Sequence, residues 1–125
     1  KPYTVVRRAG LKIGIIGLLT DISRVVDKKL VGELAYQDPA ELINRYASVL
    51  RNEEDCDLVL CLSHLGFSLD VEVVPQIRNV DVIVGGHSHT ELDSIEYVKD
   101  LDGKEVPVVQ DWCWGMSVGN LKVRY

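Results

Sequence analysis

The sequence of 125 residues has little of several features that would assign a protein quickly to a class. No run of Lys and Arg exceeds a pair, as at Arg7-Arg8 and Lys28-Lys29, and the formal net charge is −5. A basic surface for a nucleic-acid backbone is therefore absent, and we expect no nucleic-acid binding. No apolar stretch approaches the roughly 20 residues of a membrane-spanning helix, and no segment resembles a signal peptide, so no membrane span is expected in this chain.

Cysteine is also scarce. The chain has three cysteines, an odd number, and their positions form neither a disulfide framework nor a CxxC pair. Cys56 and Cys61 flank an apolar run, and Cys113 lies between Trp112 and Trp114. We expect buried free thiols and tryptophans that pack in or against the core, with a place for the tryptophans at the border of a substrate cleft as the alternative.

What is present is an ordinary globular composition, with 46% hydrophobic and 26% charged residues, and a length that suits one domain at most. The sequence begins on Lys1-Pro2-Tyr3 without a methionine. We therefore expect it to be a processed or excised piece of a longer protein.

The first half of the chain predicts a hairpin followed by a helix. Residues 4–8 and 11–19 are rich in β-branched residues and are separated by a turn, and the second run is apolar on both faces, as in a central strand. Residues 20–37 show no sustained period and are expected to form a loop with at most one short turn of helix. Asp38-Pro39 then predicts a helix start, and apolar residues at helical spacing continue to Arg51-Asn52.

The second half predicts a strand, helix, strand rhythm. Residues 57–62 and 81–84 are short apolar runs, and a weaker helix is expected between them, from Ser68 or Asp70 to about Ile77. This order favours parallel pairing of the strands.

After His89 the pattern changes to alternation at residues 94–98, 106–110 and 118–124, which predicts antiparallel strands with a turn at Asp102-Gly103. The expected fold class is therefore α/β, with a mixed sheet of parallel strands followed by an antiparallel C-terminal part.

All three histidines of the chain, His64, His87 and His89, come directly after predicted buried strands. The carboxyl ends of parallel strands meet at one edge of a sheet, where open α/β sheets bind ligands. Gly85-Gly86 before the second histidine would allow close backbone approach. Imidazoles suit divalent transition metals, so the pattern predicts a metal site. Three imidazoles could hold one zinc with a water, whereas a dinuclear site needs a bridging anion and more oxygen donors.

Several other residues allow a functional interpretation, and each also has a structural one. Gly14 and Gly17 lie in an apolar strand with no helix start behind them, which favours close packing over a nucleotide loop. Ser63 and Ser88 neighbour histidines, but no G-x-S-x-G elbow supports a serine hydrolase. Asp21 follows a predicted strand and either lies near the site or serves the loop turn.

The histidine motifs resemble the second half of a calcineurin-like metallophosphoesterase domain, most closely the 5′-nucleotidase branch. The residues that carry the resemblance are Asp57-Leu-Val-Leu-Cys-Leu-Ser-His64-Leu-Gly66 and Val80-Asp81-Val-Ile-Val-Gly-Gly-His87-Ser-His89-Thr90. The resemblance extends through Tyr3 to Leu18 and through Pro107 to Gln110, Gly115 and Gly119-Asn-Leu-Lys, so it covers nearly the whole chain.

By this resemblance, His64 and His87 would ligate one metal of a pair and His89 the other, while Gly66, Gly85 and Gly86 would shape the loops. The family's Asp-x-His, Gly-Asp and Gly-Asn-His motifs, which supply the remaining ligands and the catalytic histidine, are absent from the sequence. No catalytic residue is therefore assigned within this chain. Residues 1–125 are expected to be the C-terminal portion of a catalytic domain, half of a four-layer sandwich.

The resemblance implies that the parent protein removes phosphate from nucleotides or related phosphoesters with two divalent metal ions, among which Zn, Mn, Fe and Co are not distinguished. It also suggests a periplasmic, extracellular or cell-surface location. We expect the isolated chain to be inactive, and its uncovered half-domain face to favour a homo-oligomer or a domain swap. The alternative is a non-catalytic metal-binding or interaction module that assembles with a partner chain.

Overall fold

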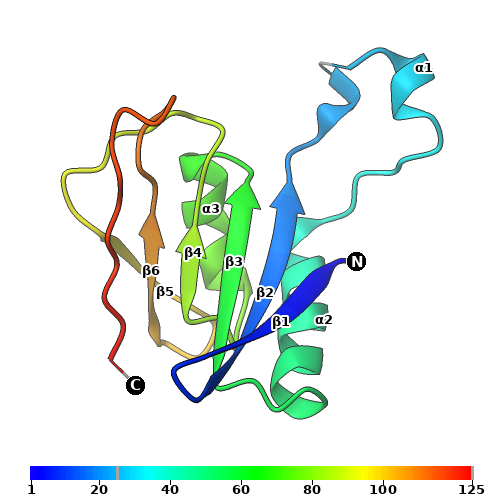
Figure 1. The fold of residues 1–125 in the computed structure, drawn as a ribbon. Coiled ribbons are helices and arrows are strands. Elements are labelled where there is room, and N and C mark those ends of the chain that lie inside the picture. The colour runs from blue at the N-terminus through cyan, green and yellow to red at the C-terminus, as the bar shows by residue number, and fades with distance from the viewer. Residues whose placement is uncertain (25, 125) are drawn as a thin grey trace.

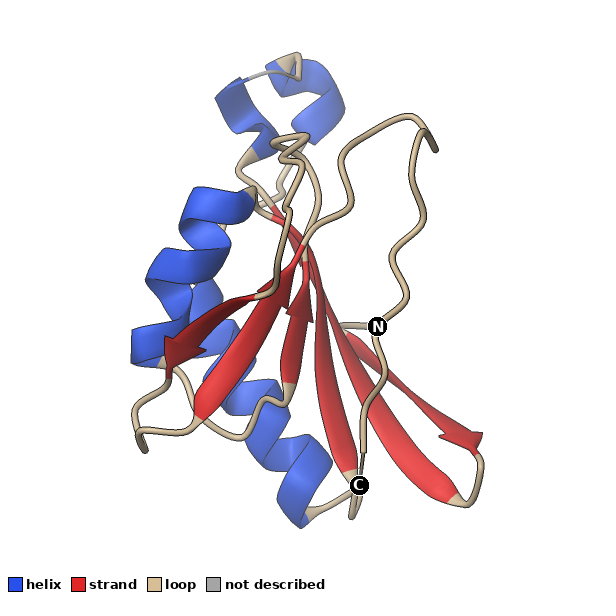
Figure 2. Ribbon diagram, turned by 90° about the vertical axis from the view of Figure 1, so that its left-hand side faces the viewer, coloured by secondary structure: helices blue, strands red, loops and turns tan. Residues whose placement is uncertain are grey.

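A computed structural model describes residues 1–24 and 26–124. Its centre is a six-stranded sheet in the order β1-β2-β3-β4-β6-β5, with the two longer helices on one face (Figures 1 and 2). The strands are β1 (Tyr3–Arg8), β2 (Leu11–Leu19), β3 (Leu58–His64), β4 (Val82–Val84), β5 (Glu96–Lys99) and β6 (Glu105–Val109). The helices are α1 (Lys28–Val31), α2 (Pro39–Asn52) and α3 (Phe67–Val73), with 3₁₀ turns at Ile22–Arg24 and Val74–Gln76.

Strands β2, β3, β4 and β6 run parallel, while β1 and β5 add antiparallel edges. The register pairs Leu19 with His64 and Leu62 with Val84, so β2, β3 and β4 end at the same edge of the sheet. The mixed α/β fold class is therefore confirmed. The parallel part continues further than expected, because β6 is antiparallel to β5 but parallel to β4.

Helix α2 forms where the sequence predicts it. The Asp38 carboxylate caps its first turn by accepting a hydrogen bond from the Glu41 N–H at 3.0 Å, and Pro39 occupies the first helical position. Its buried residues face the sheet, and α2 contacts both β2 and β3. This helix joins two neighbouring parallel strands, which makes the parallel register of β2 and β3 possible.

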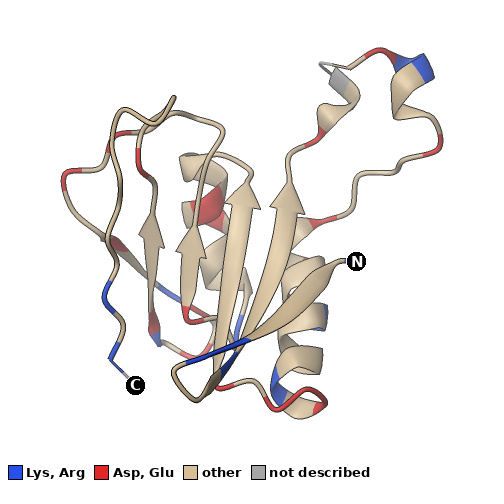
Figure 3. Cartoon of the chain, in the orientation of Figure 1, with Lys and Arg blue, Asp and Glu red and all other residues tan. Residues whose placement is uncertain are grey.

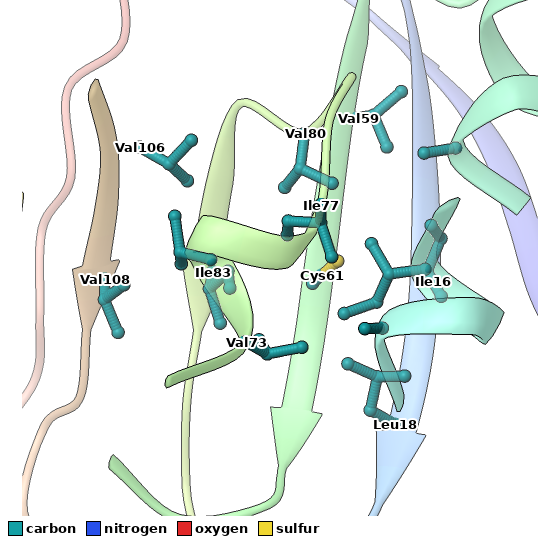
Figure 4. Close-up of a cluster of buried hydrophobic side chains, with 14 of the residues drawn as sticks. Ile16, Leu18, Val59, Cys61, Val73, Ile77, Val80, Ile83, Val106 and Val108 are labelled. Carbon is teal, nitrogen blue, oxygen red and sulfur yellow. The ribbon is translucent and has the colours of Figure 1, made fainter. Parts of the chain in front are cut away.

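The hydrophobic core lies between the helices and one face of the sheet (Figure 4). Members of the core come from α2, α3 and alternate positions of four strands, among them Ile16, Ile43, Leu50, Val59, Cys61, Val73, Ile83, Val106 and Val108. Cys56, Cys61 and Cys113 are buried and free, as predicted, and burial raises the pKa of Cys61 to about 12. The Cys61 thiol is accordingly a packing group at neutral pH.

The opposite face of the sheet is apolar and largely uncovered. Leu19 and Leu62 lie on this face and are 55% and 58% exposed. Within the described part of the chain no helix covers it, and the C-terminal segment passes along this side (Figure 2). One face of the sheet is therefore covered by helices, and the other is largely uncovered within the described chain.

Residues 118–124 do not form the predicted third antiparallel strand. Both hydrogen-bonding edges of β6 are already taken, by β4 and β5, so the alternating segment after it has no free edge beside it. The expectation that the tryptophans pack in or against the core is wrong for Trp114, which is 83% exposed. The helix expected near residues 68–77 ends earlier, at Val73, and Pro75 lies in a 3₁₀ turn instead.

The connection between β2 and α2 projects from the body of the molecule and includes the one-turn helix α1 (Figure 1). This agrees with the predicted loop and its short helical turn. None of the helices within residues 1–24 and 26–124 is both long and apolar enough to cross a membrane. Charged residues lie mostly around the periphery, and β3 and β4 carry none (Figure 3).

Asp81 joins several elements at the lower end of the sheet. Its Oδ2 accepts a hydrogen bond from the Val59 N–H at 2.8 Å and pairs with Arg51 of α2, and its Oδ1 lies 2.6 Å from Lys104 Nζ. We predict that Asp81→Ala lowers the free energy of unfolding by about 2 kcal/mol, because charge-assisted hydrogen bonds to partly buried donors are lost. Urea unfolding measures this change.

The matched control is Asp102→Ala. Asp102 pairs with Arg78 at 3.7 Å, and both side chains are more than half exposed. An exposed pair of this kind contributes about 0–1 kcal/mol, so the control should change stability less. Equal effects of the two substitutions would contradict the linking role of Asp81.

Candidate metal centre

Parallel pairing brings two histidines of different loops together. His64 is the last residue of β3, and His87 lies in the loop that follows β4. Their ring centroids are 5.0 Å apart, with the ring planes inclined by 65°. Both residues are exposed, so their imidazoles are accessible at the upper edge of the sheet.

The imidazole of His89 packs against a different residue from those of His64 and His87. Its imidazole makes an edge-on contact with Trp114, with centroids 5.6 Å apart. Across residues 1–24 and 26–124, no group of three or more His, Cys, Asp or Glu side chains is arranged to hold a metal ion. The described chain therefore unites two of the three predicted imidazoles and holds the third against an indole.

The loop that carries His87 and His89 has an unusual backbone. Both residues adopt positive φ, 78° and 54°, a conformation that costs an L-residue of order 1–3 kcal/mol and persists only where the surroundings enforce it. Gln110 supplies part of that support. Its Nε2 donates to the Gly86 carbonyl at 3.0 Å, and its Oε1 accepts from the Ser88 hydroxyl at 3.0 Å.

The glycines predicted to shape the loops all face a site residue closely. Gly66 has a φ of +100°, and a Cβ added there would lie 3.5 Å from His87 Cδ2. A Cβ at Gly86 would lie 3.2 Å from His64 Nδ1. At Gly85 the approach is tighter still, because an added Cβ would lie 2.4 Å from Asp70 Oδ2. A side chain would be strained at Gly66 by its positive φ, tight against His64 at Gly86, and in collision with Asp70 at Gly85.

Beneath the loops lies a buried polar group that the sequence reasoning missed. Asp70 is fully buried on α3, and its Oδ1 accepts a hydrogen bond from the Ser63 hydroxyl. Its Oδ2 has no hydrogen-bond partner among the described residues. Burial raises the pKa of Asp70 to about 6, against the lowering effect of the Ser63 bond. One signal was available, since Asp70 occupies helical spacing with Phe67 and Val73 on the face that meets the sheet.

Asp21 follows β2 at the same edge. Its carboxylate accepts a hydrogen bond from the Ser23 N–H at 3.0 Å, and the preceding Thr20 N–H donates to the His64 carbonyl at 3.2 Å. Asp21 and Leu65 both line a cavity of about 450 Å³ under the projecting connection. The structure gives this residue a local turn contact, and its place near the chemistry stays a prediction.

The donors present fit part of a metal site. Two exposed imidazoles in edge contact are ligands of the type that zinc and similar ions take. Two clustered imidazoles do not close a coordination shell, so a complete site would need donors in addition to these two.

Comparison with known proteins gives a consistent family. A scan against protein-family models finds no match. A 5′-nucleotidase-related protein of Glossina morsitans morsitans is 33% identical over 98% of this chain and 24% of its own length. A snake venom 5′-nucleotidase of Gloydius brevicauda is 31% identical over 98% of this chain and 23% of its own length.

The fold is shared with a solved relative. The 5′-nucleotidase precursor from Thermus thermophilus superposes with a TM-score of 0.82 and 37% identity, over 91% of this chain and 24% of that one. Sequence and fold thus relate the chain to nucleotide phosphoester hydrolases at the level of the family. More narrowly, the chain is a relative of the 5′-nucleotidases, which confirms the resemblance of its motifs. It spans about a quarter of the length of these relatives.

The raised pKa of Asp70 predicts a pH dependence of stability in the metal-free chain. The folded-state pKa of about 6 lies above the ordinary value, so the stability associated with the protonated form is complete below about pH 4 and is lost as the pH rises through 6. Relative to Asp70→Asn, the unsubstituted chain should lose about 2 kcal/mol between pH 4 and pH 7. Urea unfolding of both proteins at the two pH values measures it, and a constant difference would refute the assignment.

Proposed function

We propose that this chain is the C-terminal portion of the catalytic domain of a metal-dependent phosphoester hydrolase that removes phosphate from nucleotides or related phosphoesters. The observation that carries the proposal is the contact of His64 and His87, 5.0 Å between ring centroids, at the ends of adjacent parallel strands. The relation to 5′-nucleotidases supports the reaction class.

In this proposal His64 and His87 hold one divalent ion and His89 contributes to a second. When bound, such ions would supply the activation of a water and the neutralisation of charge on the phosphoryl oxygens. The chain's own part is to orient the imidazoles. Gln110 fixes the loop backbone around His87, and the edge contact with Trp114 limits the rotation of His89. Oriented neutral imidazoles lose less freedom on binding an ion than mobile ones.

Two observations support the assignment to part of a domain. The chain matches about a quarter of the length of its relatives. Its sheet also has an apolar face at Leu19, Leu62 and Val84 that is uncovered within the described chain. Sheets with one covered face usually pack the other against a further layer when it is this apolar. We infer that the remaining ligands of a dinuclear site belong to the part of the domain that supplies this layer.

We further propose a location outside the cytoplasm. Support comes from the venom 5′-nucleotidase of Gloydius brevicauda, whose name places that relative in a secretion.

The uncovered face also favours a second candidate function, a non-catalytic module that assembles with a partner chain or with a second copy. Exposed Leu19 and Leu62 are suited to such packing. Size-exclusion chromatography with light scattering of the 125-residue chain tests whether it assembles with a second copy. A concentration-independent monomer would count against self-association.

The metal assignment predicts the behaviour of a single variant. His87→Ala should lower bound divalent metal, because one of the two clustered imidazoles is lost, while Tyr97→Ala on β5 serves as a control at another exposed aromatic position. Metal analysis after equilibration with Zn²⁺ or Mn²⁺ measures the content. Unchanged metal in His87→Ala would remove the site as proposed.

The domain assignment predicts the activity of the isolated chain. With at most three imidazole ligands, the 125-residue chain should bind a divalent transition metal weakly and hydrolyse nucleoside monophosphates little or not at all. Phosphate release from a nucleoside monophosphate, with and without added metal, measures this. Turnover by the pure chain at rates comparable to 5′-nucleotidases would overturn the assignment.

A further inference from the structure

One buried carboxyl group lies between the two histidine loops and has no role in the proposed ligand set. Buried polar or charged side chains are few in the described chain, namely Ser63, Asp70, Asp100 and Gln110. All but Asp100 lie under the loops that carry His64 and His87. The polar interior is therefore concentrated where the proposed ligands meet.

Asp70 reaches the first loop through Ser63. The Ser63 hydroxyl donates to Asp70 Oδ1 and accepts a hydrogen bond from the Leu65 N–H at 3.1 Å. Ser63 and Leu65 are the two neighbours of His64 in the chain. The carboxyl group thus fixes the backbone on both sides of this histidine.

Asp70 reaches the second loop by direct contact. Its Oδ2 lies so close to Gly85 that a Cβ there would approach it to 2.4 Å. The Gly85 N–H donates a hydrogen bond to the Val109 carbonyl at 2.8 Å, which opposes a shift of the Gly85 backbone away from Asp70. Gln110 also packs against this segment and donates to the Gly86 carbonyl. The backbone that leads to His87 is therefore packed against the carboxyl group.

This arrangement is costly to the fold. A fully buried carboxyl group with one oxygen unpaired in the described chain loses hydration without complete compensation. An apolar side chain at this position would avoid that cost, as apolar residues do elsewhere in the core. The loss of hydration at Asp70 has a structural reason if its short, hydrogen-bonding side chain fixes the distance between the two loops, which a flexible apolar side chain would not do.

We propose that Asp70 is a positioning residue that sets the spacing of the His64 and His87 loops, with Gly85 as its matched partner. The metal part of this inference rests on the proposed function, whereas the spacing itself is a property of the metal-free protein. Asp70 acts through Ser63 and the backbone of Gly85 and does not bind the ion.

The first experiment measures the affinity for Co²⁺ alone, by its visible absorption, in the complete gene product that contains this chain. Asp70→Ala should weaken Co²⁺ binding about 10–100-fold, the usual cost of losing a group that orients metal ligands. Asp70→Asn, which keeps the shape and an acceptor for Ser63, should restore most of the affinity. Asp100→Ala removes a buried carboxyl that, among the described residues, accepts hydrogen bonds within the β5–β6 turn, and should leave the affinity unchanged.

The second experiment tests the spacing without metal. Gly85→Ala should lower the melting temperature markedly in the unsubstituted protein, because its Cβ meets Asp70 Oδ2. In the Asp70→Ala background the same substitution should cost much less, which is a coupling between the two positions. Equal losses in both backgrounds would overturn the proposal.

The possible results distinguish the proposed function from the positioning role of Asp70. If the unsubstituted protein binds no Co²⁺, the proposed function falls, and the coupling of Gly85 and Asp70 still decides the inference. If Co²⁺ binds and His87→Ala abolishes binding while Asp70→Ala does not alter it, the proposed function stands and the positioning role is refuted. A loss in Asp100→Ala equal to that in Asp70→Ala would also refute it.

Discussion

The parallel pairing of β3 with β2 and β4 determines where the histidines of this chain lie. Because all three strands run in one direction, their carboxyl ends and the loops that follow share one edge. Residues far apart in sequence, His64 and His87, then meet, and the Phe67 N–H at the end of the first loop donates a hydrogen bond to the Ser88 hydroxyl of the second at 3.0 Å. Helix α2 and helix α3 make this possible, since each supplies the crossover between one parallel pair. An antiparallel arrangement would have placed the two histidines at opposite ends of the sheet.

Two features that destabilise the fold lie at the sheet edge that carries the histidines. Two histidines adopt left-handed backbone, and a carboxyl group lies in the core beneath them. Such features concentrate at functional sites because the required geometry seldom coincides with the most stable one. Here the compensation is local: Gln110, Ser63 and Ser88 supply the hydrogen bonds that hold the loops. The polar groups that support the loops therefore lie next to the exposed imidazoles.

Much of the fold and part of the site follow from the sequence alone. The apolar runs of β2, β3 and β4 and the cap at Asp38 are local signals, and they appear where predicted. The strand expected at residues 118–124 failed, because alternation says nothing about whether an edge is free to pair. The histidines were visible through their place after strands. The helical spacing of Asp70 indicates only that its side chain faces the sheet. Its approach to Gly85 is a contact between helix α3 and the loop after β4, which spacing along the chain does not reveal.

Residues 26–37 of the projecting connection between β2 and α2 add little to the core, and Leu30 and Leu34 there are more than two thirds exposed. Segments of this kind open at a small fraction of the free energy that unfolds a sheet. Amide hydrogens there should exchange with solvent early, and a protease should find its first cleavage site there. The molecule thus contains two levels of stability, a sheet that unfolds as one unit and a peripheral arm beside its histidine edge that can open alone.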